Sequence, residues 1–113
     1  MPSPLAARRC VPCRKGTPPL AVADRDRLLD ELGGGWAVRE GRHLFKEYRF
    51  PDFGTALAFV NRVGAEAEAE GHHPDIELTW GRVAIKIWTH AIDGLTESDF
   101  VLAAKADAVR GDG

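Results

Sequence analysis

The chain has 113 residues, enough for one domain with one modest core. Its hydrophobic share of 44% and charged share of 28% are those of an ordinary globular domain, so disorder is not the default. A net charge of -2 and a pI of about 6.1 argue against general electrostatic binding to nucleic acid or acidic membranes. No apolar run approaches the roughly 20 residues that span a bilayer, and no apolar segment follows Arg8 and Arg9 as in a secretory signal. We therefore expect a cytoplasmic protein.

The first twenty residues contain five of the seven prolines. This density blocks regular helices and strands, so residues 1–20 are predicted to form a flexible arm. The arm carries both cysteines, Cys10 and Cys13, separated by two residues. Two reduced thiols in a mobile leader are one interpretation, and a zinc site shared between subunits or a redox role are the alternatives.

A short helix and a hairpin are predicted next. Leucines spaced among charges indicate a helix from about Asp24 to Leu32, ended by three glycines. Residues 36–40 and 43–50 are predicted to pair around a Gly-Arg turn. Trp36 at the strand start is interpreted as a core anchor, with ligand stacking as the alternative, and His43 as an ordinary strand residue.

A long amphipathic helix is predicted after Asp52, a natural N-cap, up to about Glu70. At about 100° per residue, Glu68 falls roughly 20° from the line of Leu57 and is expected on the inward face. Glu66 and Glu70 are expected on the solvent side.

Two adjacent histidines follow the end of this helix, in the run Gly71-His72-His73-Pro74. Imidazole is the side chain whose ordinary pKa lies nearest neutral pH, so the pair is a candidate acid/base site. The alternative is a turn in which both histidines are simply solvated.

The next stretch is predicted to be a second hairpin, turning at Gly81-Arg82. Strict alternation along its returning strand places His90 away from the aliphatic face of Val83, Ile85 and Ile87. His90 is therefore expected either on the other face of the sheet or at a strand end where the pleat has lapsed.

The last helix is predicted to start at Thr96 and to run to about Val109, with residues 110–113 fraying. Thr96 as N-cap and Asp99 at the third helical position have the spacing of a capping box. The predicted class is α+β, in the order α-β-β-α-β-β-α, with three helices packed on one face of a four-stranded antiparallel sheet.

Three motifs follow one another along the chain: Glu68-x-x-x-His72-His73-Pro74, then Trp88-Thr89-His90, then Gly94-Leu95-Thr96-Glu97-x-Asp99. This ordered set resembles the pterin-4a-carbinolamine dehydratase family. The resemblance includes Gly35-Trp36 and residues 44–53 and covers roughly residues 20–109, which makes residues 21–109 the expected domain. The leader with its two cysteines resembles bacterial members.

The resemblance implies a lyase, a 4a-hydroxytetrahydrobiopterin dehydratase, which converts 4a-hydroxytetrahydropterin to quinonoid dihydropterin and water in tetrahydrobiopterin recycling. Hydroxide is a poor leaving group, so an acid must protonate the 4a-oxygen while a base accepts the proton on ring nitrogen N5. Histidines can serve both roles. Neither step requires a metal or an organic cofactor, so none is expected.

By the same resemblance, His72 and His90 match the acid/base histidines, and His73 matches the histidine that holds the pterin. The other candidates, for orienting the imidazoles or forming the pocket wall, are Glu68, Asp99, Thr89 and Trp36. A metal site formed by the three histidines is an alternative, although adjacent histidines point in different directions.

The partners implied by the resemblance are a pterin substrate, an aromatic amino acid hydroxylase pathway and further copies of the chain, as a homodimer or homotetramer. Ile76 and Trp88 differ from the residues of the animal members at these positions. The sequence therefore lends no support to the second role of the animal members, as partners of a transcription factor. A different class of answer is a non-catalytic pterin-fold protein with a binding, regulatory or assembly role.

Overall fold

The computed structural model describes residues 4–11 and 15–110. Its elements confirm the predicted order of three α-helices and four strands, and add two short 3-10 helices. In chain order they are η1 (Pro4–Ala7), α1 (Val22–Leu32), β1 (Ala37–Arg39), β2 (His43–Arg49), α2 (Phe53–Glu70), β3 (Asp75–Thr79), β4 (Arg82–Ile87), η2 (His90–Ile92) and α3 (Glu97–Arg110).

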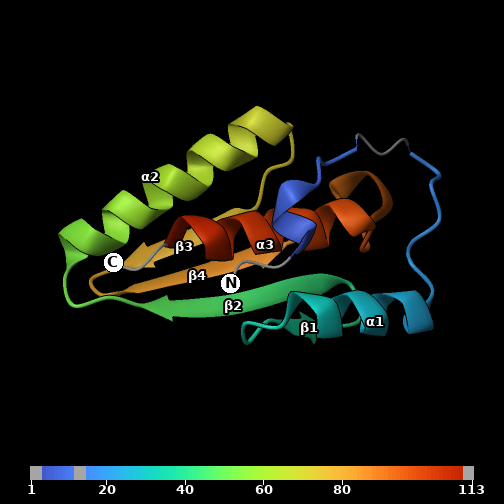
Figure 1. The fold of residues 1–113 in the computed structure, drawn as a ribbon, viewed down its shortest axis with the longest axis horizontal. Helices are drawn as coiled ribbons and strands as arrows, with labels where there is room; N and C mark the ends of the chain where they lie inside the picture. Colours follow the sequence, from blue (N-terminus) through green and yellow to red (C-terminus); the bar gives the residue numbers. More distant parts are fainter. Residues whose placement is uncertain (1–3, 12–14, 111–113) are drawn as a thin grey trace.

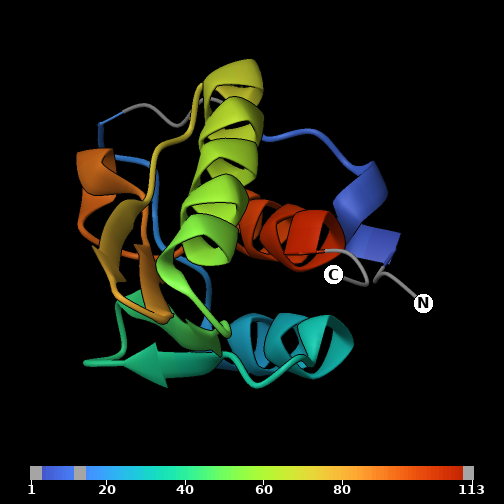
Figure 2. The same cartoon turned by 90° about the vertical axis from the view of Figure 1, so that its left-hand side faces the viewer.

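The four strands form one antiparallel sheet in the order β1-β2-β4-β3. Figures 1 and 2 show all three α-helices on the same side of this sheet, which confirms the predicted arrangement. The alternation in β4 has the predicted phase, since Val83, Ile85 and Ile87 are fully buried on the helical side. Leu44 of β2 lies opposite Ile87 and is buried with them.

Helix α2 begins and ends with side-chain and backbone caps. The Asp52 carboxylate accepts hydrogen bonds from the Thr55 backbone N–H and hydroxyl, both at 2.7 Å. These bonds hold the pKa of Asp52 below its usual value. At the other end Gly71 adopts the left-handed conformation, with φ of 66°, which only glycine adopts without strain.

Helix α3 lies at the centre of the helical layer. Its residues from Ser98 to Ala106 are all buried. Near its C-terminus Asp107 accepts hydrogen bonds from Lys46 Nζ at 2.7 Å and from the Tyr48 hydroxyl at 2.5 Å. Burial and the Asp107 carboxylate raise the pKa of Tyr48, so this phenol stays protonated and donates. The predicted helix end near Val109 falls one residue short, because Arg110 is still helical.

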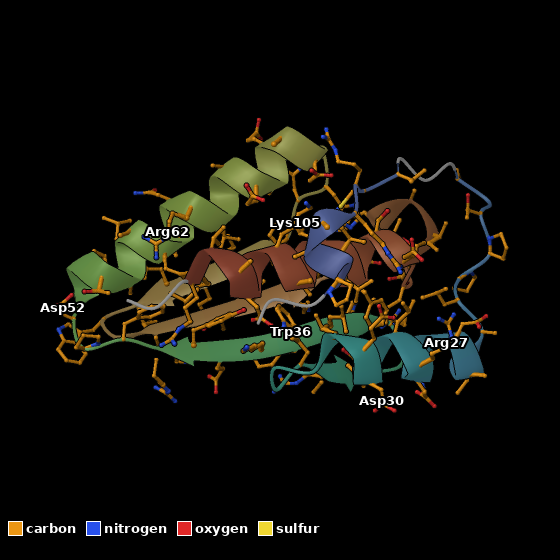
Figure 3. All side chains as sticks on the ribbon, viewed as in Figure 1. Arg27, Asp30, Trp36, Asp52, Arg62 and Lys105 are labelled. Atoms are coloured by element: carbon orange, nitrogen blue, oxygen red, sulfur yellow. The ribbon has the colours of Figure 1, made fainter. Side chains whose placement is uncertain are left out.

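Within the predicted flexible arm, the structure describes residues 4–11 and 15–20. Pro4–Ala7 form a 3-10 helix whose Leu5 is fully buried in the main core. Lys105 Nζ of α3 donates to the Ala6 carbonyl at 2.8 Å. Lys105 is labelled in Figure 3. The prolines of this segment disfavour long helices and strands, but they do not prevent Leu5 from packing into the core.

Within residues 4–11 and 15–110, no helix has both the length and the apolar character needed to cross a membrane.

Candidate functional site

A pocket of about 250 Å³ lies where the end of α2, the end of β4 and the leader meet. The three histidines predicted to form the site all line it. Its full lining is Cys10, Val11, Glu70, Gly71, His72, His73, Trp88, Thr89, His90 and Ala91.

His72 is positioned by the end of α2. Its backbone N–H bonds to the Ala67 carbonyl at 3.2 Å, and the Gly71 N–H bonds to the Glu68 carbonyl, which together form a Schellman cap. The cap fixes the backbone of His72, and its imidazole Nε2 lies 2.6 Å from Oδ1 of Asp99. With the carboxylate as acceptor, Nε2 carries the proton and Nδ1 is the remaining acceptor of the ring.

Asp99 is fully buried at the start of α3 and makes three polar contacts. Oδ1 faces His72, while Oδ2 accepts from the Thr89 hydroxyl and from the Thr96 backbone N–H, each at 2.8 Å. The bond to the Thr96 N–H is one half of the predicted capping box. Thr89, also buried, thus contacts the carboxylate and lines the pocket.

His73 and Glu68 form a second pair, with Nε2 2.9 Å from Oε1. Both side chains are exposed, and that of Glu68 retains 80% of its accessible surface. The prediction that Glu68 lies on the inward face of α2 is therefore wrong.

Glu70 is the inward acid of this helix, with 7% of its side chain exposed, although it was predicted to face solvent. The line of Leu57 does not mark the inward face, because Leu57 is itself 40% exposed. The buried line of α2 is Ala56, Phe59, Val63 and Ala67, and its next position is 70 or 71. That line, read from the sequence by itself, would have found Glu70.

His90 lies just past the end of β4, as the first residue of η2. Of the two placements expected for it, the structure has the strand end. Its exposed ring packs on Trp88 with centroids 4.3 Å apart, and the buried His43 contacts Trp88 at 4.7 Å. His43 and His90 therefore both contact the Trp88 ring, a link that the sequence around His43 did not indicate.

Trp36 is not among the residues that line this pocket, and its role in a pocket wall stays a prediction. Its indole N–H donates to Asp107 at 3.0 Å, and Figure 3 shows it between α3 and β2. Asp107 and Asp99 are eight residues apart on α3, which corresponds to about 12 Å along the helix. Trp36 is the core anchor that the sequence also suggested.

Cys10 and Val11 line the pocket although the sequence placed them in a free arm. Burial, followed by the Glu70 carboxylate, raises the pKa of the Cys10 thiol from 9.0 to about 12, so it remains a neutral thiol. Cys13 lies outside the described residues. Among the described residues no three histidine, cysteine or acidic side chains are grouped so that they could hold a metal ion.

The arrangement can transfer protons. Three imidazoles face one small pocket, and each ring has a different neighbour: a buried carboxylate, an exposed carboxylate and an indole. An imidazole can donate a proton or accept one, so a group of three can supply both the acid and the base of a reaction.

Comparison with known proteins gives consistent results. A family model described as pterin 4 alpha carbinolamine dehydratase matches residues 18–109. A protein of Rubrobacter xylanophilus is 54% identical over 105 residues, which are 93% of this chain and 97% of that protein. A protein of Rickettsia bellii is 51% identical over 106 residues, 94% of each chain. Both are named "Putative pterin-4-alpha-carbinolamine dehydratase".

Two solved structures share the fold. A transcriptional coactivator/pterin dehydratase from Brucella melitensis matches with a TM-score of 0.77 at 32% identity, over 83% of this chain and 100% of that one. A pterin dehydratase-like protein identified as a RuBisCO assembly factor in the alpha-carboxysome matches with a TM-score of 0.59 at 28% identity, over 69% and 92%. The match of the family model to most of the chain and the identities above 50% show that the chain belongs to the pterin 4 alpha carbinolamine dehydratase family.

Proposed function

We propose that this protein dehydrates a 4a-hydroxytetrahydropterin to quinonoid dihydropterin and water by histidine general acid/base catalysis. The observation that carries the proposal is the convergence of His72, His73 and His90 on one pocket, with His72 bonded to the buried Asp99. The names of the relatives support the same activity.

The reaction needs two proton movements. An acid protonates the 4a-oxygen so that it leaves as water, and a base accepts the proton from N5, which leaves a C=N bond between N5 and C4a. His72 and His90 are assigned to these transfers, without deciding which is the acid. Positioned acid/base groups typically contribute about 10²- to 10⁴-fold in rate.

The other side chains have supporting roles in this proposal. His73 binds the pterin, and the exposed Glu68 orients its ring through the bond at 2.9 Å. Asp99 fixes the tautomer and orientation of His72, and Thr89 holds Asp99. In this proposal Glu68, Asp99 and Thr89 are positioning residues, because each acts through a histidine or through a neighbour of a histidine.

The wider setting is also a proposal. The reaction would take place in the cytoplasm, return the pterin to an aromatic amino acid hydroxylase, and be carried out by a homodimer or homotetramer. The sheet face without helices supports self-association (Figure 2). Light scattering should then give two or four times the chain mass of 12.3 kDa.

The activity is tested with full-length protein treated with a chelator and added to 4a-hydroxytetrahydropterin generated in situ. Formation of quinonoid dihydropterin is followed by absorbance, and we expect a rate well above the spontaneous reaction. A rate equal to that background would refute the enzyme and favour a binding or assembly role like that named for the RuBisCO assembly factor. Loss of activity on chelation, restored by added metal, would favour a metal site instead.

A further inference from the structure

The leader backbone is attached to two different helices next to the pocket. The Cys10 N–H donates to Glu70 Oε1 of α2 at 2.7 Å. The Val11 N–H donates to the Ser98 hydroxyl of α3 at 2.8 Å, and that hydroxyl lies 3.1 Å from the Val11 carbonyl. Both polar groups of Val11 are thus paired with one buried side chain.

The acceptors on the domain are buried, which distinguishes this attachment from a loose surface contact. Ser98 is 4% exposed, and the Glu70 side chain is almost fully buried. Lys105 lies 3.8 Å from Glu70 and donates to the Ala6 carbonyl, and Leu5 fills the core beneath. A buried acceptor left without its donor costs free energy, so the domain favours the docked leader.

The docked segment presents uncharged atoms to the histidine pocket. Cys10 and Val11 line the pocket with His72, His73 and His90. The Cys10 Sγ lies 3.4 Å from the Ser98 carbonyl, and a neutral thiol packs as a small apolar group. An aliphatic side chain beside a neutral thiol suits the flat, uncharged face of a bicyclic ring.

We infer that the leader segment Cys10–Val11 is a wall of the pterin pocket, and that Glu70 and Ser98 are positioning residues that hold this wall in place. The inference rests on the proposed function for the identity of the ligand. The wall adds contact area in the bound state without touching the proton-transfer groups, so its loss weakens binding and leaves the chemical step unchanged.

The test uses full-length variants and two readouts. The first is the Kd of 7,8-dihydrobiopterin, a stable pterin, by calorimetry, together with kcat and KM. The second is the rate at which iodoacetamide alkylates Cys10, resolved from Cys13 by tandem mass spectrometry. The variants are Ser98→Ala and Glu70→Gln, and the matched control is Glu66→Gln, one helical turn earlier on α2.

Ser98→Ala and Glu70→Gln should each raise Kd and KM about tenfold with kcat within about twofold, which is the pattern of lost uniform binding. Both should speed alkylation of Cys10 at least about tenfold, because an undocked thiol regains water and its ordinary ionisation. Glu66→Gln should change neither readout. A third variant, Val11→Ala, keeps the backbone bonds, so it should raise Kd about threefold with no change in alkylation.

Several outcomes would overturn the inference. Faster alkylation of Cys10 with unchanged Kd would mean that the leader docks but is not a wall of the site. A fall in kcat at constant Kd would mean that Ser98→Ala acts through its neighbour Asp99. Binding of the pterin without turnover in the wild-type protein would refute the proposed function alone. Absence of both binding and turnover in the wild-type protein would refute both.

Discussion

The Asp99 carboxylate accepts hydrogen bonds at both of its oxygens, and the two oxygens serve different parts of the molecule. Oδ2 caps the first turn of α3 through the Thr96 N–H, and Oδ1 contacts the His72 imidazole. The cap stabilises the helix, while the same bonds prevent the carboxylate from turning away from His72. Asp99 therefore both caps helix α3 and orients the His72 ring.

Asp99→Asn should lower kcat about 10²- to 10⁴-fold, as expected when a histidine is held in the wrong tautomer. The amide oxygen would stay with the donors Thr89 and Thr96, so its NH₂ would face Nε2 of His72 and move the ring proton to Nδ1. Steady-state kinetics measure the loss, and ¹⁵N NMR of the His72 ring measures the change of tautomer. An unchanged kcat would remove Asp99 from the mechanism.

Asp107→Asn is the matched control, because it makes the same change on the same helix eight residues away. Asp107 holds Trp36, Lys46 and Tyr48 rather than a pocket residue. The variant should lose about 1–3 kcal/mol of unfolding free energy, because the amide keeps one acceptor oxygen and its NH₂ group leaves the donors at the other position without an acceptor. Its kcat, measured below the unfolding transition, should match that of the wild-type protein.

Single residues also show where sequence reasoning succeeds and where it does not. The spacing of Thr96 and Asp99 is local, so the capping box could be read directly from the sequence. The Trp88 ring contacts His43 of β2 and His90 of η2, and no local pattern encodes these contacts. The inward acid of α2 is encoded in the spacing of its buried residues, whereas the partly exposed Leu57 indicates the wrong face.

Among the elements, η1 in the leader is the one whose packing could not be predicted from the sequence. A run of residues without helical or strand periodicity carries no phase from which burial can be inferred. Only the contacts of η1 with α3 reveal that Leu5 belongs to the core. We therefore expect residues 4–11 to contribute to the stability of the folded domain.

Leu5→Ala should destabilise the protein by about 2–5 kcal/mol, the usual cost of truncating a fully buried leucine. Chemical denaturation measures the loss. Val22→Ala is the control, since Val22 is 60% exposed at the start of α1, and it should stay within about 0.5 kcal/mol of the wild-type protein. A Leu5→Ala variant as stable as this control would show that the leader contributes nothing to the fold.

The remaining elements were predictable because their periodicity and their caps agree. The alternation in β4, the extent of α2 up to Glu70 and the cap at Asp52 were each predicted as they are observed. Figure 1 shows how these elements are arranged in space. Which elements contact one another could not be predicted from local sequence patterns. The pocket lies where three such segments come together. Its histidines were predicted from sequence motifs, whereas the contribution of the leader to its wall was not.

At the scale of the whole molecule, acid sensitivity should reveal the attachment of the leader. The Cys10 backbone N–H, with help from Lys105 and Arg9, holds the pKa of Glu70 below its usual 4.5. The folded protein therefore takes up this proton at lower pH than the unfolded chain does. The stabilisation from Glu70 is present at neutral pH and is lost as the pH falls below about 5 through the folded pKa.

Urea denaturation of the wild-type protein and of Glu70→Gln between pH 7 and pH 3 tests this linkage. The wild-type protein should be more stable at pH 7, and the difference in unfolding free energy should shrink as the pH falls. Asp52 and Glu47 also have lowered pKa values, but both are present in each protein, so their contributions cancel. A difference that is constant over the pH range would mean that Glu70 holds the leader without its charge.

The claim that these histidines transfer the protons of a pterin dehydration is tested most directly by the turnover of single-histidine variants. Dehydration of 4a-hydroxytetrahydropterin should be measured for the wild-type protein, His72→Ala, His90→Ala and His73→Ala. We expect kcat to fall at least about 10²-fold in each of the first two, and His73→Ala to act mainly on KM. A His90→Ala variant with the kcat of the wild-type protein would contradict the account.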